Sequence, residues 1–148
     1  MGHMKLYKSV LHDKKNTIPQ WFQETISSYV SIINKCKYSY DNHWKNAVFL
    51  INDQNKSDKI KVVLESQKPE DYFKGKELAL LIYAKKLTLY PSRFNIDDFR
   101  KLKVEGLEDG EILEANQIIC YFNYVNRSIN GLGVTTEGDI VGYYENEK

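Results

Sequence analysis

Apolar side chains recur every three or four positions along most of the chain, which is the spacing of one face of an α-helix. The first such run extends to about Asn34 and has Pro19 in its first turn, where a proline is well tolerated. Its other face carries Glu24 and several serines. Its apolar positions are Ile18, Phe22, Ile26, Tyr29 and Ile33. The pattern predicts an amphipathic helix over residues 18–34.

Further helical runs follow, separated by short polar or glycine-containing segments. They cover about residues 38–51, 58–66, 76–90, 96–103 and 110–130. Asn95 and Asp109 precede the last two runs as capping residues, and Gly133 marks the end of the longest. Residues 5–15 have no clear period and are expected to form a partly ordered arm, whereas the tail after Val134 is expected to be extended. Because the helical period dominates, we expect an all-α fold, a compact bundle of about six helices.

The length and composition fit one globular domain. The chain has 148 residues, of which 42% are hydrophobic, enough for a single core. Residues 1–4, Met-Gly-His-Met, are interpreted as a cloning scar, so the domain is expected to cover residues 5–148. No apolar run is long enough to cross a bilayer and no signal-peptide pattern occurs, so a cytoplasmic location is expected.

The charged and polar residues argue against several classes of partner. There are 21 lysines and arginines against 20 aspartates and glutamates, so no general field draws the chain to nucleic acid or to an acidic membrane. His12 and His43 lack the spacing of paired metal ligands, and no glycine-rich phosphate loop precedes a helix. We therefore expect no metal, no cofactor, no nucleic acid and no membrane partner.

The segment 34–43, NKCKYSYDNH, holds the residues with the most evident chemistry. Cys36 and Ser39 flank the expected start of the second helix, whose unpaired N–H groups and dipole stabilise a thiolate. His43 lies one turn beyond Ser39 on the same face, where its imidazole can exchange a proton with a neighbouring sulfur. On spacing alone the simpler interpretation stays open, since a cysteine before a helix is usually a small packed residue and a histidine on an apolar stripe is usually structural.

Two stretches of the chain resemble one protein family. The first is residues 24–43, ETISSYVSIINKCKYSYDNH, and the second is residues 106–134, GLEDGEILEANQIICYFNYVNRSINGLGV. They resemble the alkyl-hydroperoxidase-D-like (AhpD-like), or carboxymuconolactone-decarboxylase-like, superfamily, and in particular its peroxidase-related branch. The resemblance covers about residues 18–134 and implies an AhpD-like helical domain.

The family pattern is a glutamate, then a Cys-x-x-Cys motif, then a histidine one helical turn further on. Glu24, Cys36 and His43 match the glutamate, the first cysteine and the histidine, while Ser39 stands at the second cysteine. In the family the two cysteines cycle between dithiol and disulfide, and the glutamate and histidine relay protons to them. A serine cannot close that cycle. Ser39 is either a natural divergence or an engineered replacement, and the sequence leaves both explanations open.

The resemblance implies a thiol-dependent antioxidant protein, an alkyl hydroperoxide peroxidase or disulfide reductase. Cys36 is then the reacting thiol and Glu24 and His43 are its proton relay, while Ser39 offers only a hydrogen bond and weakens the activity. The implied partners are an organic hydroperoxide or a small disulfide, an external thiol reductant, and further copies of the chain in a trimer or hexamer. The alternative is a catalytically inactive helical oligomer that binds a small molecule or a partner in the same pocket.

Other polar groups of the longest predicted helix have weaker claims to a function. Cys120 lies in the apolar run 118–122 and is expected to be a buried, inert thiol. The remaining polar side chains are expected to hydrogen-bond helix ends or neighbouring subunits. They are Asn116, Asn123, Asn126 and Arg127.

Overall fold

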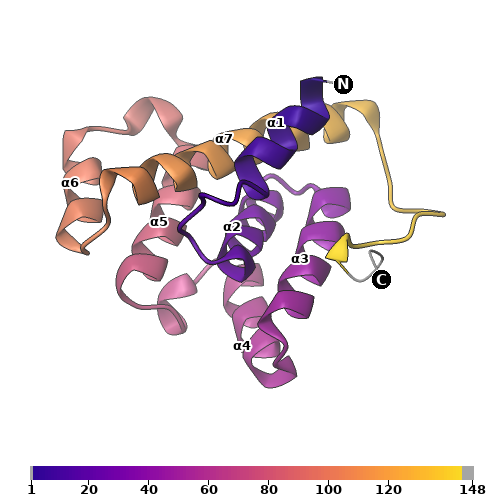
Figure 1. Ribbon diagram of the computed structural model, residues 1–148, viewed down its shortest axis with the longest axis horizontal. Helices are drawn as coiled ribbons and strands as arrows, with labels where there is room; N and C mark the ends of the chain where they lie inside the picture. Colours follow the sequence, from indigo (N-terminus) through magenta and orange to yellow (C-terminus); the bar gives the residue numbers. More distant parts are fainter. Residues whose placement is uncertain (1, 145–148) are drawn as a thin grey trace.

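The computed structural model describes residues 2–144, and these form seven α-helices and two short 3₁₀ helices without any strand. The α-helices are α1 (Gly2–Leu11), α2 (Gln20–Ile33), α3 (Lys37–Ile51), α4 (Gln54–Glu65), α5 (Gly75–Leu89), α6 (Ile96–Val104) and α7 (Asp109–Leu132). The 3₁₀ helices are η1 (Pro69–Asp71) and η2 (Pro91–Arg93). Figure 1 shows α7 along the upper edge, with α2, α3 and α5 below it. The all-α fold predicted from the sequence is confirmed.

Helix α2 is the centre of the bundle, because it packs against α3, α4, α5 and α7. Every residue from Phe22 to Ser31 is buried. A helix buried on all sides must satisfy its own polar groups. The hydroxyls of Ser27, Ser28 and Ser31 do so by donating to backbone carbonyls four residues back, at 2.8 Å each. These small side chains leave room for the neighbouring helices to approach α2 closely.

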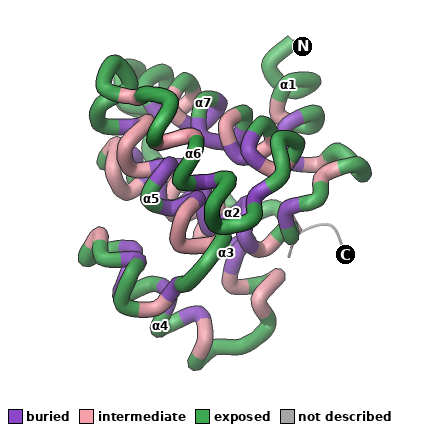
Figure 2. Tube along the Cα trace, turned by 90° about the vertical axis from the view of Figure 1, so that its left-hand side faces the viewer, coloured by how far each residue is buried: buried purple, intermediate pink, exposed green. Residues whose placement is uncertain are grey.

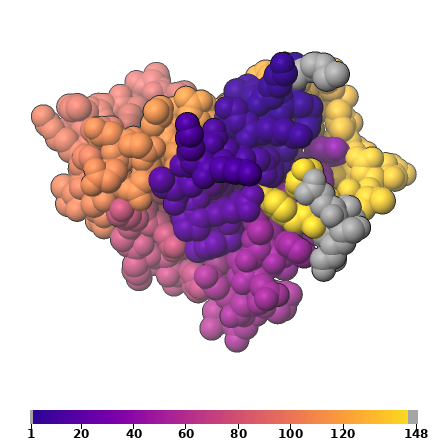
Figure 3. All heavy atoms as spheres, in the orientation of Figure 1, coloured from indigo at the N-terminus to yellow at the C-terminus, as the bar shows by residue number. Residues whose placement is uncertain are grey.

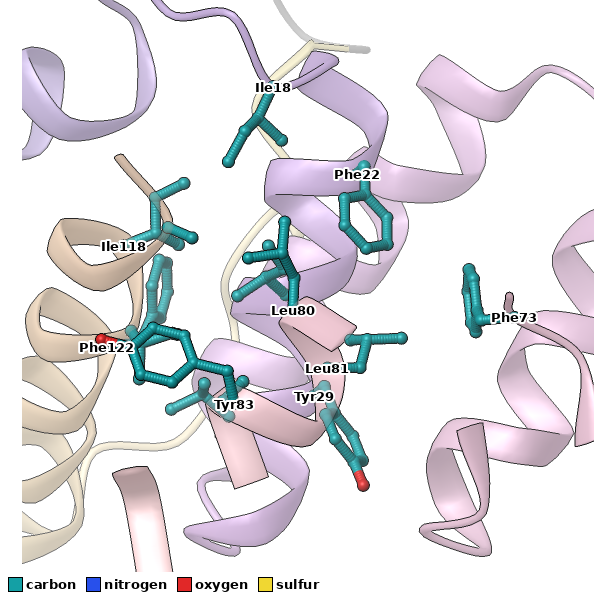
Figure 4. Close-up of a cluster of buried hydrophobic side chains, with 14 of the residues drawn as sticks. Ile18, Phe22, Tyr29, Phe73, Leu80, Leu81, Tyr83, Ile118 and Phe122 are labelled. Atoms are coloured by element: carbon teal, nitrogen blue, oxygen red, sulfur yellow. The ribbon is translucent and has the colours of Figure 1, made fainter. Parts of the chain in front are cut away.

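The apolar core lies between α2, α5 and α7. Figure 4 shows Phe22 and Tyr29 of α2 beside Leu81 of α5, with Phe122 of α7 in the same cluster. Figure 2 shows the buried stretches gathered where these three helices meet, while α6 is largely exposed. Burial of each such side chain contributes about 1.5–3 kcal/mol relative to its exposed form. This core fixes α2 in place and so fixes the polar face that α2 presents to α3.

The structure corrects the sequence predictions at both ends of the chain. The segment expected to be a partly ordered arm forms helix α1, because the side chains of Val10 and Leu11 are buried and the helix packs on α7. The tail after α7 forms turns rather than an extended strand, and its backbone is hydrogen-bonded to α3. Helix α4 begins at Gln54, earlier than expected, because the Asp53 side chain caps it.

Tyr29 has a fully buried side chain whose hydroxyl finds no hydrogen-bond partner among the described residues. Burial, and then the nearby Glu70 carboxylate, raise the pKa of this phenol to about 12. An unfolded tyrosine ionises near pH 10. The neutral phenol therefore contributes its full share to the free energy of unfolding below about pH 10. This contribution is lost as the pH rises towards the pKa of Tyr29 in the folded protein.

We expect Tyr29→Phe to remove an alkaline loss of about 2 kcal/mol in the free energy of unfolding between about pH 10 and 12. The same change should stabilise the protein by about 1 kcal/mol at neutral pH, because it deletes a buried hydroxyl without a partner. Urea unfolding at several pH values measures both effects. An unchanged slope in Tyr29→Phe contradicts the assignment.

Candidate functional site

The candidate site lies where α2 runs into α3. The chain turns at Lys35, which adopts the left-handed conformation with φ 54°, and Cys36 is the N-cap residue of α3. The backbone N–H of Cys36 donates to the carbonyl of Ser31 at 2.9 Å, which holds the start of α3 against the end of α2. The four site residues predicted from the sequence therefore come from one pair of consecutive helices.

The Cys36 thiol and the Ser39 hydroxyl are in contact. The Cys36 Sγ lies 3.5 Å from the Ser39 Oγ. Both residues are buried, with 1% of Cys36 and 3% of Ser39 exposed. Both groups lie in the first turn of α3, beside backbone N–H groups that have no acceptor within the helix. The fold thus brings the two residues together at a helix N-terminus.

Glu24 and His43 form a buried hydrogen-bonded pair. The His43 Nδ1 lies 2.6 Å from the Glu24 Oε2, and the two side chains are 13% and 1% exposed. The Asn46 amide donates to the other carboxylate oxygen at 3.3 Å. A carboxylate on Nδ1 fixes the orientation of the ring and leaves Nε2 as the nitrogen for proton exchange.

Glu24 lies on the polar face of α2, so its burial depends on what covers that face. In the structure α3 covers this face within a single chain, with His43 and Asn46 against the carboxylate. The His43 ring is held in turn by Phe122 of α7, edge to face with 4.5 Å between centroids. A neighbouring subunit is not needed to complete the pair.

A cavity of about 300 Å³ lies beside Ser39 and His43. Its walls come from α1, α3, α7 and the tail, and they contain no Asp, Glu, Lys or Arg. Aromatic side chains form much of the lining: Tyr7, Tyr38, Tyr121, Phe122 and Tyr143. Among the described residues, Ser39 reaches this lining and Cys36 does not. The hydroxyl therefore stands between the thiol and the cavity.

Sequence reasoning missed two contributors to the site, Asn46 and the tail. The backbone N–H of Tyr143 donates to the Asn46 Oδ1 at 2.6 Å, and that of Gly142 donates to the Asn42 Oδ1 at 3.0 Å. Asn46 follows His43 by three residues, so helical spacing alone places both on one face of α3. Nothing in the sequence pattern could have placed the tail beside them.

The polar residues of α7 have structural roles. Asn123 meets the C-terminal end of α2, where the Asn34 Nδ2 donates to its Oδ1 at 3.1 Å, as expected for a residue that bonds a helix end. Asn126 is buried and donates to the Ser31 Oγ at 3.2 Å. The prediction that Cys120 is buried was wrong, since it lies on an exposed position of α7. Partial burial still raises the pKa of its thiol, which disfavours the reactive thiolate.

Two kinds of site find no support in the part of the chain that the structure describes. Within residues 2–144 no group of three His, Cys, Asp or Glu side chains could hold a metal ion. None of the described helices is long and apolar enough to cross a membrane.

No family model matches the chain, and no curated protein matches its sequence. Solved structures do share its fold. An uncharacterized peroxidase-related protein from Silicibacter sp. TM1040 superposes with a TM-score of 0.81 at 20% sequence identity, over 90% of this chain and 68% of its own. An uncharacterized peroxidase-related protein with an alkylhydroperoxidase AhpD core, from Ralstonia eutropha JMP134, gives 0.77 at 18% identity, over 88% of this chain and 66% of its own.

A third structure has a length closer to that of this chain. It is a protein of unknown function from Agrobacterium tumefaciens, proposed to be the antioxidant defence protein AhpD, with a TM-score of 0.71 and 21% identity over 90% of this chain and 87% of its own. The chain spans about two thirds of the length of the first two neighbours. The AhpD-like helical fold predicted from the sequence is therefore confirmed.

Proposed function

We propose that the chain is a thiol-dependent antioxidant protein of the AhpD-like superfamily, an oxidoreductase for an organic hydroperoxide or a small disulfide. The observation that carries this proposal is the buried Glu24–His43 pair, 2.6 Å apart, on the same helix pair as the Cys36–Ser39 contact of 3.5 Å. The descriptions of the structural neighbours as peroxidase-related or as an antioxidant defence protein support the same general function.

Hydroperoxide reduction begins at the sulfur of Cys36. The thiolate attacks the outer oxygen of the hydroperoxide, the O–O bond breaks, and the departing alkoxide takes a proton from the His43 ring to leave as an alcohol. The sulfur is thereby oxidised to a sulfenic acid. One external thiol condenses with it and releases water, and a second frees Cys36 as an external disulfide forms. One hydroperoxide and two thiols thus give an alcohol, water and a disulfide.

The remaining groups of the site prepare this reaction. Glu24 holds the His43 ring through Nδ1, so the ring delivers its proton from Nε2. Ser39 donates a hydrogen bond to the thiolate but supplies no second sulfur. The sulfenic acid therefore waits for an external thiol, and the turnover of this chain is slow.

Trapping of the sulfenic acid tests the proposal directly. After exposure to cumene hydroperoxide in the presence of dimedone, we expect the adduct on Cys36 and little on Cys120, measured by mass spectrometry of the tryptic peptides. A Cys120→Ser variant should give the same yield on Cys36, and a Cys36→Ser variant should give almost none. An adduct confined to Cys120, or no adduct at all, contradicts the thiol mechanism.

The second candidate function is an inactive scaffold that binds a small molecule. It is favoured by one observation: Ser39 and not Cys36 reaches the cavity, and only 1% of Cys36 is exposed. The uncharged aromatic lining suits a neutral organic ligand. Under this alternative no sulfenic acid is trapped, while a neutral aromatic alcohol such as cumyl alcohol still binds and displaces a fluorescent probe from the cavity.

We also propose that the chain forms a homo-oligomer, a trimer or a hexamer. The apolar side chains of α7 are mostly buried within one chain, so they need no partner, but α5 leaves Ile82 53% exposed between two surface hollows.

Light scattering should give three or six times the chain mass of 17.3 kDa. Ile82→Glu should lower that mass, because a charge on an apolar contact disfavours association, while Val104→Glu on exposed α6 should not. A mass of one chain contradicts this prediction.

A further inference from the structure

The tail is hydrogen-bonded to the same face of α3 that carries His43. After Gly133 the chain leaves α7 and returns to α3, as Figure 1 shows, and the tail lies against the N-terminal segment in Figure 3. Its backbone is fixed there by the bonds from Gly142 to Asn42 and from Tyr143 to Asn46. Both acceptors are side chains of the site helix, so the position of the tail and the position of these amides depend on each other.

Asn46 links the tail to Glu24. Its oxygen accepts from the Tyr143 N–H at 2.6 Å, and its nitrogen donates to the Glu24 Oε1 at 3.3 Å. With the amide reversed, its oxygen would face a carboxylate and its NH₂ would face an N–H, and neither contact could form a hydrogen bond. Asn46 is only 2% exposed, so water cannot readily replace a lost partner. The bond from the tail to the Asn46 oxygen therefore fixes the amide orientation in which the Asn46 NH₂ group donates to Glu24.

The Tyr144 hydroxyl is bonded to the turn of α2 that precedes Glu24. It accepts from the Gln20 Nε2 at 2.8 Å, and Gln20 precedes Glu24 by one turn on the same face of α2. Burial, followed by the charge of the Glu24 carboxylate, raises the pKa of the phenol, as expected for two groups that lie close together. The ring is held by stacking on Phe49, with 8° between the ring planes. Since the hydroxyl accepts from Gln20, its own proton is left for an acceptor, and the two candidates are the Glu24 carboxylate and the His12 Nδ1, which lies 3.5 Å away.

We propose that Asn46 and Tyr144 are positioning residues for the Glu24–His43 pair, so that the tail segment 142–144 is a working part of the site. Together with the His43 Nδ1, they offer the buried carboxylate three donors, two from α3 and one from the tail. A carboxylate held in this way cannot rotate, and it keeps the His43 ring turned with Nε2 towards the cavity. The role assigned to the pair rests on the proposed function, whereas the contacts themselves do not.

A double-mutant cycle measures the link between Tyr144 and Glu24. In the native chain, Tyr144→Phe should raise the unfolding equilibrium constant about tenfold, which corresponds to ~1.4 kcal/mol. In a Glu24→Leu background the same change should have less than about a threefold effect, because the acceptor is gone. Equal effects in both backgrounds would mean that the tyrosine only packs, and they would overturn the proposal. Tyr124→Phe on the exposed side of α7 is the matched loss of a hydroxyl and should show no coupling.

The proton on the His43 Nδ1 gives a second readout that does not require the Glu24 variant to fold. A proton shared over 2.6 Å with a carboxylate should give a far-downfield NMR signal that exchanges slowly with water. Tyr144→Phe should shift this signal upfield and speed its exchange about tenfold, while Tyr124→Phe should leave it unchanged. An unaltered signal in Tyr144→Phe overturns the proposal.

Neither measurement uses a substrate or a turnover rate. If cumene hydroperoxide forms no sulfenic acid but the His43 signal responds to Tyr144→Phe, the proposed function fails and the positioning role stands. If the sulfenic acid forms and the signal does not respond, the positioning role fails and the proposed function stands.

Discussion

Ser39→Cys is expected to raise the dithiol-dependent turnover of an organic hydroperoxide by about a hundredfold or more. A sulfur at this position lies at contact distance from Cys36, since the present Sγ–Oγ separation is 3.5 Å. A thiol held in place acts at an effective concentration far above the millimolar concentration of an external thiol, so the sulfenic acid is resolved at once to a disulfide. The new thiol also faces the cavity, where a hydroperoxide meets it first. Turnover is measured by the loss of hydroperoxide in the presence of dithiothreitol.

The control for this variant removes the partner sulfur. Ser39→Cys combined with Cys36→Ser keeps one thiol on the cavity side and should lose most of the gain. Ser39→Ala should give no gain over the parent chain. If Ser39→Cys forms the disulfide with Cys36 and still gains no turnover, the antioxidant function fails and the binding scaffold becomes the better proposal.

His43→Leu is expected to lower the free energy of unfolding by about 3 kcal/mol or more, because it leaves the buried Glu24 carboxylate without its closest partner. This is a large fraction of the 5–15 kcal/mol that stabilises a typical domain. Exchanging both residues for leucine should restore stability to within about 1–2 kcal/mol of the parent, with Asn46 and Tyr144 each left lacking one acceptor. Urea unfolding with a constant m-value provides the comparison.

The double exchange also separates stability from chemistry. It should fold, yet Cys36 should no longer yield a trapped sulfenic acid at an appreciable rate, since the proton donor for the departing alkoxide is absent. If the double variant is as unstable as His43→Leu alone, the loss of stability does not come from the unpaired Glu24 carboxylate, and the prediction is contradicted.

Helical spacing predicted much of the fold because most helices carry their own boundary signals. Helix α6 is the clearest case: Asn95 accepts from the N–H of Asp98 while the Asp98 side chain accepts from the N–H of Asn95, a capping box that depends only on neighbouring residues. Helix α1 lacked such a signal, since its burial of Val10 and Leu11 depends on α7, more than 90 residues away in the chain. Local patterns cannot show a surface that only the folded bundle provides.

The site divides in the same way. Cys36, Ser39 and His43 were predictable because one helix and its N-cap residue place them at fixed spacing. Glu24 was identified by the resemblance to a family pattern. Helical spacing places it on a polar face of α2, which by itself predicts an exposed side chain, so its burial by α3 could not be predicted. Helical spacing places Asn46 beside His43, but its bond to the tail and the role of Tyr144 depend on hydrogen bonds between residues 97 or more positions apart. Contacts of that range leave no periodic trace in a sequence.

The separation of α3 from the tail has a consequence for the order in which the site is made. Helices α2 and α3 are adjacent in the chain, and such local pairs form within microseconds to milliseconds once both are synthesised. The residues that hold Asn46 and reach Glu24 come about 100 positions later. At a synthesis rate of about 5–20 residues per second, they follow roughly 5–20 seconds afterwards. Each nascent chain therefore carries Glu24 and His43 for several seconds before the tail can bond to Asn42 and Asn46.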